Sequence, residues 1–199
     1  MPEPTSTAGW VAHRYARVQA RVLTAVTDLD EETLRWRPPG TNSIAFNLWH
    51  LARWADQLAF IVPLMAPELS AQLGRYEQIW ERERLAKAWG FPAPGELGHV
   101  ETGMGMDEGL SARLPLPRMD TLLDYATRAF TAAQRATTSI GDELFPRPAT
   151  LDLALVPWLS KPEDVGTIGT WTLAYCVHDA QHLGMINTLK GMRGIDTGA

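Results

Sequence analysis

Apolar residues recur three or four positions apart in four long stretches of the chain. In the first stretch the apolar positions are Val11, Tyr15, Val18, Val22, Ala25 and Leu29. This spacing places one apolar stripe along a helix, and no stretch shows a convincing strand pattern. The pattern predicts amphipathic helices at residues 10–29, 43–64, 119–140 and 167–192. Four such helices predict an all-α four-helix bundle, and we expect one domain over residues 1–199.

Local signals mark where these helices begin and end. Pro38, Pro39 and Gly40 cannot continue a helix, so we interpret residues 30–40 as a turn. Ser43 and Thr167 carry hydroxyl groups that can cap the second and fourth predicted helices.

A long insertion, residues 66–118, separates the second predicted helix from the third. We predict one short helix in it, from Arg75 to Trp89, followed by a region rich in proline and glycine. A segment of this length between core helices is more often a lid or binding loop than a spacer. Trp80, Trp89 and Met104 are therefore candidates for lining a lid, although packing of the insertion explains them equally well.

Three histidines lie at apolar positions of two different predicted helices. His178 and His182 are four residues apart, so their side chains share one helix face, on the row that also holds Trp171, Tyr175, Met185 and Leu189. His50 lies on the apolar side of the second helix. Burial opposes a charged imidazole, and a neutral ring still has two polar nitrogens to satisfy. A metal ion would satisfy all three rings, and bundle cores are where facing helices build such sites. The sequence therefore predicts a metal site at His50, His178 and His182.

The other candidate groups favour ordinary roles. His13 shares a helix with arginines and is expected to face water, whereas His99 lies in a loop and is kept as a candidate for contacting substrate. The segment from His178 to His182 resembles the HExxH motif of zinc proteases, but Asp179 replaces the glutamate base and no downstream ligand follows. Cys176 is expected to be a buried packing residue. The sequence contains no GxSxG motif and no phosphate-binding glycine loop.

Composition narrows the class of protein further. The formal net charge is −5, which argues against a general nucleic-acid binder. Arginines are scattered along the predicted helices, and we expect them to be solvated. No stretch approaches the roughly 20 apolar residues of a membrane span, and residues 1–7 lack the pattern of a signal peptide. A single cysteine suits a reducing compartment. We therefore expect a cytoplasmic protein with no nucleic-acid and no membrane partner.

Two segments together resemble the DinB/YfiT-like superfamily of metal-binding four-helix bundles. Residues 34–51 are similar to the family's proline-glycine turn, capped helix and first histidine, and His178-x-x-x-His182-x-Gly184 is similar to its terminal motif. The resemblance spans residues 10–192. It implies a divalent metal, commonly zinc or nickel, held by His50, His178 and His182. It also suggests a homodimer.

The resemblance further implies an activity. Members of known activity are thiol S-transferases or isomerases that use low-molecular-weight thiols, and many others are described only as metal-dependent hydrolases. We expect a thiol S-transferase acting on an electrophilic small molecule, with a hydrolase of a small ester or amide as the alternative. A third hypothesis is a non-enzymatic bundle in which the metal only stabilises the fold or the pocket only binds a ligand.

Three neutral nitrogens would leave a coordination position of the metal open, as in catalytic sites. Four residues are candidates for hydrogen-bonding the imidazoles or lining a pocket beside them: Asn47, Trp54, Gln57 and Asp179. Ordinary surface or interhelical contacts explain each of them equally well.

Overall fold

The computed structural model describes residues 4–197, apart from the side chains of residues 162 and 163. Within this range the chain is all-helical, and outside the helices two isolated bridges, His99–Met104 and Pro148–Thr167, pair extended backbone. The prediction of an all-α protein is confirmed. Residues 1–3 of the segment examined for a signal peptide lie outside the described range. None of the described helices is long and apolar enough to cross a membrane.

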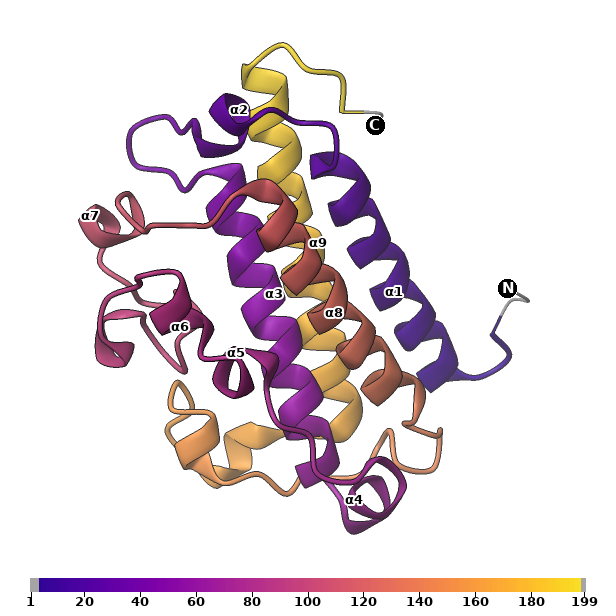
Figure 1. The fold of residues 1–199 in the computed structure, drawn as a ribbon. Coiled ribbons are helices and arrows are strands. Elements are labelled where there is room, and N and C mark those ends of the chain that lie inside the picture. The colour runs from indigo at the N-terminus through magenta and orange to yellow at the C-terminus, as the bar shows by residue number, and fades with distance from the viewer. Residues whose placement is uncertain (1–3, 198–199) are drawn as a thin grey trace.

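Four long helices form the bundle shown in Figure 1: α1 (Thr7–Val26), α3 (Ile44–Ile61), α8 (Met119–Thr138) and α9 (Ile168–Met192). Both α1 and α3 pack against α8 and α9. Helices α3 and α9 each begin at a residue whose side chain caps the helix N-terminus. Ser43 Oγ accepts from the amide of Phe46, and Thr167 Oγ1 accepts from the amide of Thr170.

Shorter elements connect the long helices: α2 (Glu31–Arg35), α4 (Pro67–Leu73), α5 (Ile79–Arg82), α6 (Leu85–Ala88), α7 (Glu108–Ser111) and the 3₁₀ turns η1 (Val62–Leu64), η2 (Pro94–Glu96), η3 (Leu153–Leu155) and η4 (Pro162–Val165). Two sequence predictions were wrong here. The single helix expected from Arg75 to Trp89 is divided into α5 and α6, because Arg84 adopts the left-handed conformation with φ 52°. The turn expected at residues 30–40 contains α2, which Asp30 caps through the amide of Thr33.

Helix α3 is buried on nearly all sides. Every residue of it except Phe60 is buried, because α8 and α9 cover its inner faces while the insertion covers the outer one (Figure 1). Trp80 and Leu97 of the insertion belong to the core and are 1% and 0% exposed. The polar side chains of α3 therefore have no water to bind and require partners inside the protein.

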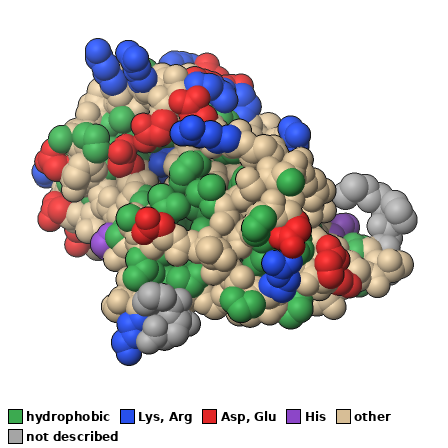
Figure 2. All heavy atoms as spheres, turned by 90° about the horizontal axis from the view of Figure 1, so that it is seen from below, with side chains coloured by type: hydrophobic (Ala, Val, Ile, Leu, Met, Phe, Trp, Pro, Cys, Tyr) green, Lys and Arg blue, Asp and Glu red, His purple; other side chains and the backbone are tan. Residues whose placement is uncertain are grey.

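Helix α9 is apolar on more than its inner face. Leu173, Val177, Met185 and Met192 are each about half exposed, at 48%, 47%, 50% and 59%. The expectation that Met185 lies on the core face with the histidines was wrong. At the end of the bundle shown in Figure 2, other hydrophobic side chains gather in a hollow, with charged side chains of both signs on the surrounding surface.

Truncating a buried side chain of α3 should lower the free energy of unfolding far more than truncating an exposed side chain just beyond the end of this helix. We expect Leu58→Ala to lower the free energy of unfolding by about 2–5 kcal/mol, because Leu58 is fully buried and leaves a cavity. Leu64→Ala is the matched control, since Leu64 is 43% exposed, and should change it by about 0.5 kcal/mol or less. Urea unfolding measures both. Equal losses in the two variants would contradict the packing described for α3.

Candidate metal centre

The three histidines named in the sequence come together between α3 and α9. His50 Nε2 lies 3.0 Å from His178 Nε2. The ring centroid of His182 lies 4.6 Å from that of His50 and 4.5 Å from that of His178. One nitrogen from each ring falls within 4.8 Å of the others, so the group could hold a metal ion.

The outer nitrogen of each ring faces an oxygen atom. His50 Nδ1 contacts the carbonyl oxygen of Thr102, and His182 Nδ1 lies 2.7 Å from Asn47 Oδ1. The Asn47 amide is oriented by its own nitrogen, which donates to the carbonyl of Ser43 at 2.8 Å. Since a carbonyl oxygen can only accept, both Nδ1 atoms carry the proton in the neutral rings. The Nε2 atoms of His50 and His182 are then left with free lone pairs.

His178 follows the same arrangement through Asp179. Its Nδ1 lies 3.3 Å from Asp179 Oδ1. The second oxygen of Asp179 accepts from Gln19 Nε2 at 3.3 Å, and Gln19 in turn accepts from Gln134. Burial raises the pKa of the Asp179 carboxyl, and the hydrogen bonds from His178 and Gln19 partly offset that effect. The His178 Nε2 atom therefore also offers a lone pair.

These lone pairs need a cation between them. Two unprotonated nitrogens 3.0 Å apart repel each other unless a proton or a metal ion lies at the centre. Burial, followed by the neighbouring His182 and His178, lowers the pKa of His50 well below its ordinary value. Burial and His178 lower the pKa of His182 to about 4. The rings thus resist an added proton at neutral pH. Three neutral imidazole nitrogens are a donor set that fits zinc or nickel and leaves a coordination position free.

A hollow of about 190 Å³ adjoins the histidines on the side of His178. We call it the aromatic hollow; its lining residues are Trp54, Met104, Trp158, Trp171, Ala174, Tyr175 and His178. The side chain of His178 is 27% exposed, whereas His50 is 6% exposed. The group of imidazoles is therefore open on the side of this hollow.

The insertion holds the loop that supplies the acceptor for His50. Val100 and Glu101 have φ values of 44° and 56°, in the left-handed region that non-glycine residues rarely occupy. Arg53 donates from Nε to the carbonyl of Glu101 at 3.0 Å and from Nη2 to the carbonyl of Val100 at 3.2 Å. These bonds hold the strained backbone in the position where the next carbonyl, that of Thr102, meets His50.

Arg53 is itself fixed by a buried carboxylate. Its Nη1 lies 3.4 Å from Asp56 Oδ2, and both side chains are almost fully buried. Asp56 also accepts from the amides of Ile79 and Trp80 at 3.0 and 2.9 Å. It further accepts from the hydroxyl groups of Tyr76 and Tyr125. The expectation that arginines are solvated was wrong for Arg53. The signal was present in the sequence, because Arg53 and Asp56 are opposite charges three residues apart on a helix that is mostly apolar.

The other candidates named from the sequence are placed as follows. Asn47 and Asp179 hydrogen-bond to His182 and His178, as described above. The Trp54 ring lies 5.5 Å from that of His178 and lines the aromatic hollow. Gln57 contacts none of the three histidines: it accepts from Gln78 Nε2 at 2.8 Å and donates to the carbonyl of Leu155 at 3.3 Å.

The remaining candidates divide between the core, the surface and the hollow. Trp80 packs among Trp49, Phe91 and Tyr125 in the core, with Trp89 beside it, so of the two alternatives for Trp80 it is packing of the insertion that holds. Met104 does line the aromatic hollow. His99 is exposed and lies outside that lining, His13 is partly buried beside Trp10, and Cys176 is partly buried against the core.

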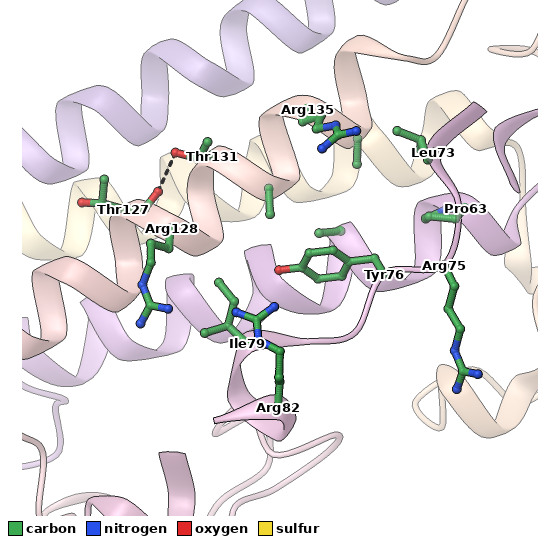
Figure 3. A pocket seen from close by; sticks show the side chains of 13 residues that line it. Pro63, Leu73, Arg75, Tyr76, Ile79, Arg82, Thr127, Arg128, Thr131 and Arg135 are labelled. Atoms are coloured by element: carbon green, nitrogen blue, oxygen red, sulfur yellow. Dashed lines mark hydrogen bonds between the residues drawn. The ribbon is translucent and has the colours of Figure 1, made fainter. Parts of the chain in front are cut away.

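A larger hollow of about 480 Å³ lies between α3, α8 and residues 73–82, away from the histidines. Four arginines line it, and among the described residues its lining contains no carboxylate, imidazole or thiol. Figure 3 shows Tyr76 lying across it and the Arg75 side chain pointing away. Arg128 is already engaged by both oxygens of Glu83, at 2.7 and 3.0 Å. This hollow lacks groups for chemistry, so the histidines remain the candidate site.

The protein is thus an all-α bundle in which three imidazoles from two helices converge on one point. The sequence profile of the DinB superfamily matches residues 14–186. The chain therefore belongs to the DinB superfamily, and the resemblance described from its motifs is confirmed. No curated protein sequence matches the chain significantly.

The oxygen that Asn47 presents to His182 should contribute to metal affinity. We expect Asn47→Leu to weaken zinc binding by about 10- to 100-fold, because the Nδ1–H of His182 loses its acceptor. Gln57→Leu is the matched control, since Gln57 is a buried amide of the same helix that does not contact the histidines. Competition with a chromophoric chelator measures both affinities. An equal loss in the two variants would contradict a specific role for Asn47.

Protonation should destabilise the metal-free protein in mildly acidic solution. The unfolded chain takes up a proton on His182 near its ordinary pKa of 6.5, whereas the folded chain does so only near pH 4. The unfolded state binds more protons between these values, so stability falls as the pH decreases through this window and is unaffected by His182 above it. We expect a loss of about 2 kcal/mol between pH 7.5 and pH 5 from this group.

Urea unfolding of chelator-treated protein at both pH values measures this effect. His182→Gln should reduce the loss, whereas His13→Gln should leave it in place. A stability that is independent of pH across this range in the unmodified chain would contradict neutral, buried imidazoles.

Proposed function

We propose that this protein is a metal-dependent enzyme that transfers a low-molecular-weight thiol to an electrophilic small molecule. The observation that carries the proposal is the convergence of three imidazoles whose outer nitrogens are all engaged by oxygens. Membership of the DinB superfamily supports it. A divalent zinc or nickel ion bound by His50, His178 and His182 would lower the pKa of a coordinated thiol, so that it acts as a thiolate near neutral pH.

The chain's own residues have defined tasks in this proposal. Asn47, Asp179 and the Thr102 carbonyl keep the proton on each Nδ1, so that the three Nε2 atoms stay available as ligands. Arg53 keeps the Thr102 carbonyl in place through the preceding two residues. The apolar walls of the aromatic hollow exclude water from the electrophile.

The lining of the aromatic hollow favours thiol transfer over hydrolysis. Hydrolysis of an ester or amide needs a group that moves a proton to the departing oxygen or nitrogen. Apart from the ligand His178, the lining named above contains no imidazole, carboxylate, amine or thiol, and the carboxylate of Asp179 is engaged by His178 and Gln19. Thiol transfer with a leaving group such as halide needs no proton donor for that group. A sulfur–carbon bond forms, the bond from carbon to a leaving group such as halide breaks, and the thiol proton passes to solvent.

Metal binding is the first part of the proposal to test. We expect the purified protein to bind one equivalent of zinc or nickel, measured by elemental analysis. His50→Ala should remove most of the metal while retaining the helical circular dichroism. His99→Ala and His13→Ala are matched controls, because neither imidazole belongs to the converging group, and both should keep the metal. Retention of metal by His50→Ala would contradict the proposed site.

Turnover is the second part. Glutathione, mycothiol and bacillithiol should each be offered with monobromobimane or chlorodinitrobenzene, and conjugation should follow metal content across the same variants. Ester or amide cleavage without conjugation would replace the transferase by a hydrolase. Stoichiometric metal with neither activity would favour a non-enzymatic bundle.

A further inference from the structure

The aromatic rings of the hollow come from three separate parts of the chain, and Met104 of the insertion completes the lining. Trp54 comes from α3, Trp171 and Tyr175 come from α9, and Trp158 comes from the connection that precedes α9. Its volume of about 190 Å³ exceeds that of an engineered apolar cavity of about 150 Å³ that binds benzene. A neighbouring hollow of about 310 Å³ shares Trp158, Trp171 and Ala174 with it. The two together offer room for a small organic molecule whose one end lies beside His178.

The walls present aromatic rings at steep angles to one another. The Trp54 ring lies 5.0 Å from that of Trp158 at 72° and 5.5 Å from that of Tyr175 at 74°. Trp158 and Trp171 lie 6.3 Å apart at 60°. A flat aromatic guest can therefore stack on one ring and meet the edge of the next, which are the two favoured arrangements of aromatic pairs.

Three buried polar atoms of this lining have no hydrogen-bond partner: Trp54 Nε1, Trp171 Nε1 and Tyr175 Oη. They are three of the seven such atoms found across the part of the chain that the structure describes. Leaving a buried donor unsatisfied costs about 1–3 kcal/mol. Because these atoms are themselves buried, a guest in the hollow meets the faces and edges of the rings and does not reach the three polar atoms.

The charges around the hollow disfavour an ionic guest. Among the residues that the structure describes, its lining contains no Asp, Glu, Lys or Arg, and the one carboxylate of the adjoining hollow, Asp164, belongs to a lining that does not include His178. A cation such as a quaternary ammonium group would be attracted by the aromatic faces. Beside His178 it would, however, be repelled by a divalent metal whose three imidazole ligands carry no charge. The hollow therefore suits an uncharged group.

We propose that the aromatic hollow binds the electrophilic substrate through a flat, uncharged aromatic group. This inference rests on the proposed function, because it names the class of molecule that would meet the thiol at the histidines. Stacking on Trp158 and edge contacts with the neighbouring rings supply the recognition.

Binding of an unreactive probe tests the inference apart from turnover. Isothermal titration of the zinc-loaded protein should show that 2-naphthol binds at least tenfold more tightly than decahydro-2-naphthol, the saturated molecule with the same hydroxyl group. Trp158→Leu should weaken 2-naphthol binding by about five- to tenfold, since it removes one aromatic wall. Trp10→Leu is the matched control, because Trp10 is 42% exposed and lies outside the lining, and should bind as the unmodified chain does.

Three results would overturn the inference: equal binding of the aromatic and saturated probes, tighter binding of tetramethylammonium than of 2-naphthol, or unaltered 2-naphthol binding by Trp158→Leu. Aromatic binding without any thiol conjugation would leave this inference standing and remove the transferase. Conjugation with no preference for aromatic electrophiles would support the transferase and overturn this inference.

Discussion

The burial of α3 governs how this molecule is built. A helix covered on nearly every side must find a partner for each polar side chain it carries, since no water reaches them. Asn47, His50, Arg53, Asp56 and Gln57 all lie on this helix and are all buried. Their partners lie on α9, on α8, on the connection to α9 and above all on the insertion, which bonds to four of the five. The interior polar contacts of α3 thereby determine how the surrounding segments are placed.

The insertion is joined to the bundle by the same requirement. The guanidinium of Arg53 lies 4.7 Å from the ring of Trp80 and also engages the carboxylate of Asp56 and the backbone of residues 100 and 101. A buried ion pair is costly to desolvate and is weak evidence for stability. Its effect here is to fix positions. Arg53 holds the carbonyls of residues 100 and 101, and the next carbonyl, that of Thr102, then meets His50. A segment that looks peripheral in the sequence thus orients a ligand of the candidate metal centre.

Periodicity and short motifs were sufficient to predict the four long helices and the three histidines. Helix faces follow from spacing within one segment, and His178 and His182 share a face for that reason. Asn47 and Asp179 were named as neighbours of the imidazoles because they lie within one turn of a ligand. Gln57 was named with them but lies two turns from His50 and bonds to Gln78 and Leu155. Contacts between distant segments, such as Arg53 with residues 100 and 101, carry no local signal. The break of the helix at Arg84 likewise depends on how the insertion packs.

The two ligands that lie 3.0 Å apart, His50 and His178, are separated by 128 positions in the chain. During synthesis on the ribosome, α3 leaves the exit tunnel long before α9 exists, so a nascent chain holds only one of the three imidazoles. Capture of a metal by all three imidazoles therefore has to wait until α9 has emerged and docked on α3. Chains stalled before α9 would lack two of the three ligands, so loading with metal reports that these two helices have packed together.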